Sequence, residues 1–96
     1  MPKGIKVIKA TPQKLSELGV DSWSPWSCET SSFDWQYDGT ETCYVKSGRV
    51  TVETADGEVD IGPGDLVQFN DGLSCRWVVK EPIRKVFSFE IDPFEE

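Results

Sequence analysis

The chain has 96 residues, 38% hydrophobic and 11% aromatic, which supplies enough apolar surface for a single domain over residues 1–96. Seventeen acidic and ten basic side chains leave a net charge of −7 at pH 7. That charge disfavours contact with phosphate backbones and anionic lipid, so we expect no nucleic-acid and no membrane partner.

A short strand and one helix are predicted at the N-terminus. Residues 5–9 have the composition of a strand. Thr11 followed by Pro12 is typical of a helix N-cap and first helical position, and Gly19 can end the helix in a left-handed conformation. We therefore expect one short N-terminal helix of about two turns.

Residues 20–29 predict an irregular segment. Pro25 cannot donate a hydrogen bond within a central strand, and the indoles of Trp23 and Trp26 require burial. We expect a loop or an edge segment that caps one end of the core, with both indoles in ordinary core packing.

From residue 32 onward, short strands alternate with turn residues. Asp56-Gly57 is a strong hairpin signal, Ser47-Gly48 is a predicted turn, and Pro82 is expected to break a strand. The expected strands cover residues 33–37, 41–46, 49–53, 58–61, 65–69, 74–80 and the segment from Ile83 through Ile91. About eight strands at this spacing predict an all-β fold, a closed or nearly closed antiparallel barrel or jelly roll.

Two residue types restrict compartment and chemistry. The three cysteines, Cys28, Cys43 and Cys75, are odd in number and widely spaced, which favours reduced thiols in the cytoplasm. Residues 1–4 show no secretion signal, and no apolar run approaches the ~20 residues of a membrane span. The chain has no histidine, so any chemistry must use carboxylate, thiol, phenol, amine or a bound cofactor.

Two segments resemble the paired motifs of the cupin superfamily. Glu41 and Gly48 have the spacing of the glutamate and glycine of the first motif, but its histidine positions hold other residues. Residues 64–75 match the second motif, with Asn70 at its proline and Cys75 at its histidine, and Val79 replaces its closing asparagine. The resemblance implies an RmlC-like jelly roll that has lost the histidine metal site.

More narrowly, the chain resembles small single-domain cupins of the ethanolamine-utilisation-Q-like and ureidoglycine-aminohydrolase-like branch. The likeness rests on Phe33-Asp34-Trp35, on residues 41–44 and 64–67, and on Cys75-Arg76-Trp77. Many members of this branch have no assigned activity. The resemblance also implies a homodimer formed through sheet edges.

The cupin likeness and the alternation of side chains along a strand together predict the barrel lining. If Glu41 points inward, as the resemblance implies, Cys43 does too, and Cys75 shares a face with Trp77. The predicted lining is Trp35, Tyr37, Glu41, Cys43, Cys75 and Trp77.

These residues suggest a small-metabolite site that needs neither metal nor another cofactor. Glu41 is the candidate acid or base, Tyr37 a hydrogen-bond donor and Cys75 a further candidate catalytic group. Trp35 and Trp77 are predicted walls for a ligand, and Cys43 completes the lining.

Each assignment has an alternative. Glu41 can instead pair across strands with lysine or arginine, and a buried cysteine more often acts as a small hydrophobe. Two other functions stay open: an enzyme with a metal held by Glu41 and Cys75, and a non-catalytic interaction module. By parity Arg76 faces away from Cys75, while the role of Lys85 depends on the register of the last strand.

Overall fold

The structure, a computed structural model, describes residues 2–90 and is built mainly of strands. The elements in chain order are β1 (Ile5–Lys9), α1 (Pro12–Leu18), a short 3₁₀ helix η1 (Val20–Ser22), β2 (Ser24–Cys28), β3 (Ser31–Gln36), β4 (Glu41–Thr54), β5 (Gly57–Ile61), β6 (Asp65–Phe69) and β7 (Ser74–Ser88). The predicted all-β fold with one short N-terminal helix is confirmed.

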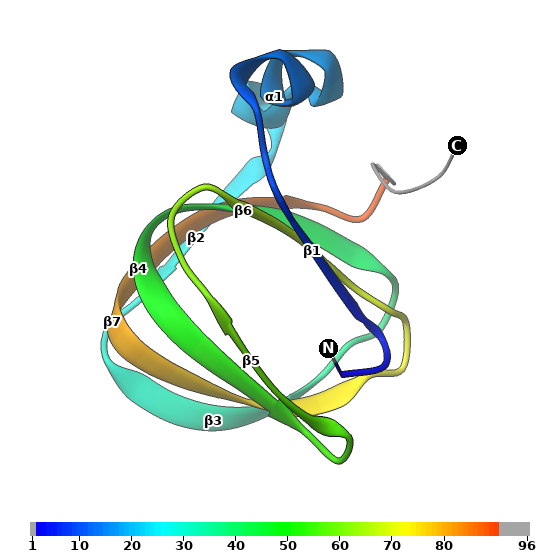
Figure 1. The fold of residues 1–96 in the computed structure, drawn as a ribbon, viewed down its shortest axis with the longest axis vertical. Helices are drawn as coiled ribbons and strands as arrows, with labels where there is room; N and C mark the ends of the chain where they lie inside the picture. The colour runs from blue at the N-terminus through cyan, green and yellow to red at the C-terminus, as the bar shows by residue number, and fades with distance from the viewer. Residues whose placement is uncertain (1, 91–96) are drawn as a thin grey trace.

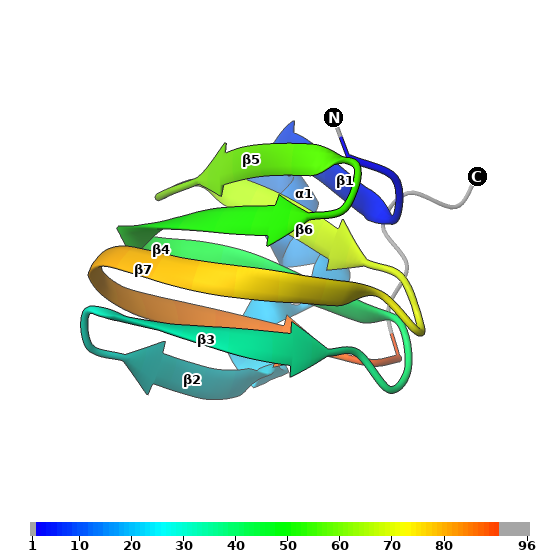
Figure 2. The ribbon, with the colours of Figure 1, turned by 90° about the horizontal axis from the view of Figure 1, so that it is seen from below.

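Two long strands, β4 and β7, pair with each other antiparallel and organise the sheet (Figures 1 and 2). The first half of β4 also pairs with β6, and its second half pairs with β5. On the other side, β3 pairs with the first half of β7 and β2 with its second half. Strand β1 extends the sheet beyond β6, and the path from β1 to β2 does not close.

A sharp bend divides the sheet into two halves that face each other. The register of β4 against β7 shifts between Val45 and Val50, which marks a β-bulge. Gly48 lies in this bulge with φ +91°, and a Cβ atom there would come within 2.1 Å of the Pro82 carbonyl oxygen. The β2–β3 connection lies beside the bent part of β7, and the β5–β6 connection lies beside the bent part of β4. The neighbouring strands therefore change direction at the same place as β4 and β7.

This bend corrects three expectations. Residues 41–46 and 49–53 form one strand rather than two, because the Ser47-Gly48 pair makes a bulge instead of a turn. Pro82 does not break β7: it lies where the ladder to β4 is irregular, so its missing N–H costs no regular hydrogen bond. These two mergers leave six of the eight expected strands, and β2, expected as a loop or an edge segment, is the seventh strand of the described residues; β7 ends at Ser88. Ile91 lies outside the described residues.

Two clusters of apolar side chains stabilise this arrangement. The larger cluster fills the space between the facing halves and includes Val45, Val52 and Phe69. The smaller cluster lies on the outer face, where Trp23 and Leu66 pack against partly buried leucines of α1. Helix α1 begins and ends as predicted, with the Thr11 hydroxyl accepting from the Lys14 N–H and a left-handed C-cap glycine. No helix within residues 2–90 has the length and apolar character of a membrane span.

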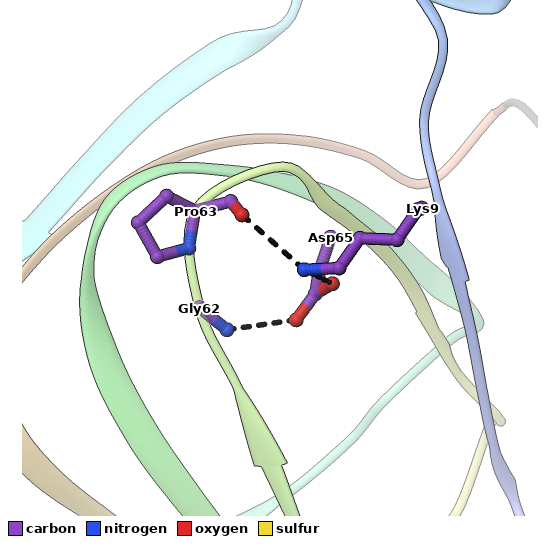
Figure 3. A network of polar contacts seen from close by, with 4 residues as sticks. All are labelled: Lys9, Gly62, Pro63 and Asp65. Atoms are coloured by element: carbon purple, nitrogen blue, oxygen red, sulfur yellow. Dashed lines mark hydrogen bonds and ion pairs between the residues drawn. The ribbon is translucent and has the colours of Figure 1, made fainter.

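A polar network fixes the corner between β5 and β6 and attaches β1 to it (Figure 3). One carboxylate oxygen of Asp65 accepts from the Gly62 N–H at 2.8 Å, and the other lies 2.7 Å from Lys9 Nζ. Lys9 Nζ also donates to the Pro63 carbonyl oxygen at 3.5 Å. The buried Asp65 carboxylate thus holds the turn and one end of β1 in place. The Lys9 side chain is 75% exposed.

Replacing Gly48 tests the close approach of β4 to β7. We expect Gly48→Ala to lower the free energy of unfolding by more than about 2 kcal/mol, because its methyl group would overlap the Pro82 carbonyl. Gly64→Ala is the matched control: its φ of +90° is nearly identical, but a Cβ there meets nothing within 4 Å. Urea unfolding of both variants measures the difference. Equal losses would contradict the role assigned to the Gly48–Pro82 contact.

Candidate functional site

A cavity of about 250 Å³ opens between the two halves of the sheet. Its volume equals that of roughly eight liquid water molecules, which suits a small metabolite. Its wall is almost entirely aromatic apart from one carboxylate and one amine. The lining residues are Trp26, Phe33, Trp35, Tyr37, Glu41, Trp77, Lys85, Phe87 and Phe89.

The polar groups of the cavity are paired with each other. Lys85 Nζ donates to Glu41 Oε2 at 2.7 Å, and both side chains are more than nine-tenths buried. Glu41 begins β4, and Lys85 lies on the second half of β7, where it faces Val45 of β4 and Trp26 of β2 in the register. A buried pair of this kind is costly to break, because the remaining charge would have neither water nor a partner.

Aromatic faces surround the Lys85 ammonium. Its Nζ lies 4.7 Å from the ring centroid of Trp77, 5.1 Å from that of Trp26 and 5.7 Å from that of Phe87. The negative face of each ring attracts the cation, so the rings replace part of the hydration that the ammonium loses. The ammonium therefore keeps its charge partner and its ring contacts inside an otherwise apolar cavity.

Trp77 is the centre of the aromatic wall. It stacks on Phe33 with centroids 6.2 Å apart, makes an edge contact with Trp26, and donates from Nε1 to the Tyr37 hydroxyl oxygen at 3.2 Å. Tyr37 in turn stacks on Phe69 at 4.7 Å. Burial, reinforced by the negative charge of Glu41, raises the pKa of Tyr37 above its ordinary value. Tyr37 is thus held as a neutral phenol with its hydroxyl proton available to a ligand.

The two core thiols lie beside the cavity but do not form its wall. Cys43 is fully buried between Glu41 and Val45, and burial raises the pKa of its thiol to about 12. Cys75 lies opposite Trp35 in the register, and burial raises its pKa to about 11. Both sulfurs are therefore protonated near neutral pH, which makes them poor nucleophiles.

The structure brings four of the six predicted lining residues to the cavity: Trp35, Tyr37, Glu41 and Trp77. Trp35 is 52% exposed and stands at the cavity mouth, as does Phe89 with the same exposure. The sequence leaves the role of Lys85 open and favours ordinary core packing for Trp26, but both residues line the cavity. The sequence signal for Lys85 is its spacing in β7. It lies two residues from Ile83 and two from Phe87, so it shares the inward face on which Cys75 and Trp77 lie.

The residues present do not fit a metal site at the position of the two cupin motifs. Glu41, at the glutamate position of the first motif, already binds an ammonium at 2.7 Å. Within residues 2–90, no group of three or more histidine, cysteine, aspartate or glutamate side chains is arranged to hold a metal ion. A divalent cation would have to displace the Lys85 ammonium from its only charge partner in the cavity wall.

Comparison with known proteins agrees with this fold. The sequence profile of the EutQ-like cupin domain matches residues 15–87. No curated protein sequence matches significantly. Among solved structures, a DUF861 family protein from Thermotoga maritima is 51% identical, with a TM-score of 0.86 over 88% of this chain and 98% of that chain.

More distant structures share the fold. A Clostridium difficile EutQ protein is 21% identical, with a TM-score of 0.61, and the match covers 66% of this chain and 50% of that one. A cupin superfamily protein from Desulfitobacterium hafniense is 12% identical, with a TM-score of 0.59 over 96% of this chain and 82% of that one.

The buried Cys43 thiol predicts a loss of stability at high pH. Between pH 9 and pH 12 the unfolded chain releases this proton while the folded chain retains it, so the free energy of unfolding falls as pH rises. Each such group contributes a slope of about 1.4 kcal/mol per pH unit. Cys43→Ala should flatten this alkaline limb in urea unfolding from pH 8 to pH 10.5. Cys28→Ala, at a half-buried site, is the control, and equal slopes in both variants would refute the prediction.

Proposed function

The chain belongs to the family of EutQ-like cupin domains, and we propose that it binds a small polar metabolite in the aromatic cavity around Lys85 and Glu41. The observation that carries the proposal is the buried pair of opposite charges inside an open aromatic cavity. A pair that served only to stabilise the core would be enclosed by side chains, but here both groups border empty space.

The charges favour a ligand with no net charge. Lys85 and Glu41 cancel each other, so a lone anion or cation entering the cavity would meet one attractive and one repulsive group. A ligand that carries both a donor and an acceptor can bind the ammonium and the carboxylate together. The ring faces of Trp26, Phe33 and Trp77 can cover its flat or apolar part.

The same groups support metal-independent acid–base chemistry. Glu41 can accept or return a proton, and Lys85 Nζ lies 2.7 Å from its Oε2, within reach for proton exchange. The Tyr37 hydroxyl can donate to an oxygen atom of the ligand, because burial keeps it protonated. We therefore assign Glu41 as the acid or base and Tyr37 as the hydrogen-bond donor.

Two other functions are weaker on this geometry. A metal enzyme that uses Glu41 and Cys75 would need both groups at one ion, but Glu41 is bound by Lys85 and Cys75 does not line the cavity. Metal analysis of untagged protein decides this alternative, and a full equivalent of zinc, iron or nickel would favour it. A non-catalytic interaction module does not require an open cavity lined by aromatic rings.

We further propose that the protein works in the cytoplasm as a homodimer. Among the strands of residues 2–90, β3 pairs only with β7, so its outer edge is available to a second copy. Cys28, Cys43 and Cys75 are all free thiols, which suits a reducing compartment.

Removing the Glu41 charge tests the proposed function. We expect a member of a metabolite panel of sugar acids, ureido compounds and amino alcohols to raise the melting temperature of the parent protein. Glu41→Gln should lose that ligand-induced shift, because the amide can neither pair with Lys85 as an anion nor act as a base. Differential scanning fluorimetry measures the shift relative to each variant's own melting temperature.

The matched control is Glu58→Gln, which removes the same charge from an exposed position on β5. Glu41→Gln will itself lower the melting temperature, since about 1 kcal/mol corresponds to roughly 4–8 °C in a domain of this size. Its circular dichroism spectrum should still match the parent. Unaltered ligand shifts in Glu41→Gln would remove Glu41 from the binding site.

A further inference from the structure

We propose that Lys85 is a nucleophile that forms an imine with a small carbonyl compound held in the cavity, with Glu41 relaying the proton. This inference rests on the proposed function and names its substrate class: a small, uncharged aldehyde or ketone with a flat or apolar body.

The position of the amine carries the inference. Lys85 Nζ combines three conditions for such chemistry: it borders the cavity, it lies 2.7 Å from a carboxylate oxygen, and it is held among the Trp26 and Trp77 rings. A distance of 2.7 Å is within the range for direct proton transfer. The amine is also pre-positioned, since its partner and the rings restrict the side chain before any ligand arrives.

Comparison with the Lys9–Asp65 ion pair shows how the cavity changes the surroundings of the Lys85–Glu41 pair. Its Nζ also lies 2.7 Å from a carboxylate oxygen, that of Asp65, but its side chain is 75% exposed whereas that of Lys85 is 7% exposed. Water stabilises the Lys9 ion pair in every state. The Lys85–Glu41 pair is instead enclosed by rings, and the first step of the proposed reaction is transfer of a proton from Lys85 Nζ to Glu41 Oε2, 2.7 Å away, which leaves an amine and a carboxylic acid.

The reaction then balances without any further reagent. The neutral Lys85 amine attacks the carbonyl carbon, the carbonyl π electrons move to oxygen, and a proton passes from nitrogen to that oxygen to give a carbinolamine. The Glu41 carboxylic acid protonates the hydroxyl group, the C–O bond breaks, and water leaves. The product is a protonated imine on Lys85 beside a Glu41 carboxylate, so the net charge of the pair is unchanged.

The cavity wall selects the substrate class. A carbonyl oxygen can accept from the Tyr37 hydroxyl, which would polarise the carbon toward attack. A flat apolar body can lie against Phe33 and Trp77, which stack nearly parallel at an angle of 17°. A volume of about 250 Å³ admits a compound of the size of benzaldehyde.

Reductive trapping tests the inference. Protein is incubated with benzaldehyde and sodium cyanoborohydride, which converts an imine to a stable benzylamine, and labelled lysines are quantified by peptide mass spectrometry. We expect Lys85 to be labelled at least about tenfold faster than Lys9 in the same sample. Lys85 labelling no faster than that of Lys9 would overturn the proposal. This ratio needs only the parent protein, so it does not depend on whether a variant folds.

A second comparison examines the proton relay. Glu41→Asp keeps the negative charge but withdraws the carboxylate from Nζ by one methylene group. We expect it to slow labelling of Lys85 by about tenfold or more while leaving that of Lys9 unchanged. Equal rates in parent and variant would exclude Glu41 from the step.

Binding controls separate this inference from the proposed function. Benzyl alcohol matches benzaldehyde in size but cannot form an imine, and Lys85→Arg keeps the ion pair but lacks a nucleophilic amine. Thermal stabilisation by benzyl alcohol without rapid Lys85 labelling by benzaldehyde would overturn the imine while leaving a ligand site. Thermal stabilisation of the parent by benzyl alcohol, rapid labelling of its Lys85 by benzaldehyde and no label at position 85 in Lys85→Arg would support both.

Discussion

The close approach of β4 to β7 at Gly48 is the constraint on which this structure depends. Only a residue without a Cβ atom, at φ +91°, lets the backbone pass the Pro82 carbonyl. The bulge at this position changes which residues of β4 point inward. Odd-numbered residues such as Cys43 and Val45 do so before the bulge, and even-numbered residues such as Val50 and Val52 do so after it. Both halves of the bent sheet can therefore point apolar side chains at each other, and the space left between them at one end is the cavity.

The Lys85–Glu41 pair is a consequence of that geometry. Cys43 of β4 faces Phe87 of β7 in the register, and the two charged side chains reach each other across this apolar pair. The enclosed position strengthens their attraction and also makes each group intolerant of losing the other. The rings of Trp26 and Trp77 reduce the cost by facing the ammonium. The contacts that stabilise the pair are therefore the same contacts on which the proposed reactivity depends.

The sequence predicted the fold better than it predicted the site. The capped helix, the edge position of β2 and the strand content followed from local signals at Thr11, Gly19 and Pro25, and the cupin likeness was confirmed by the family match. Gly48 and Pro82 were misinterpreted as a turn and a break, because a long bent strand and two short strands have the same local pattern. That error hid Lys85: along an uninterrupted β7 the alternation from Cys75 would have placed it inward.

The absence of histidine and the presence of Lys85 in the cavity have one physical explanation. The resemblance to cupins places Glu41 where the superfamily has a metal-site glutamate, and a carboxylate in an aromatic cavity requires a positive partner. Here the partner is an ammonium supplied by β7, 2.7 Å away and covalently attached to the chain. An ammonium cannot act as a Lewis acid with open coordination positions, but it can donate hydrogen bonds and, once deprotonated by its own partner, provide an amine. Under the proposed function, a built-in ammonium would thus stand in place of a bound metal cation, and proton transfer and amine chemistry in place of metal-based chemistry.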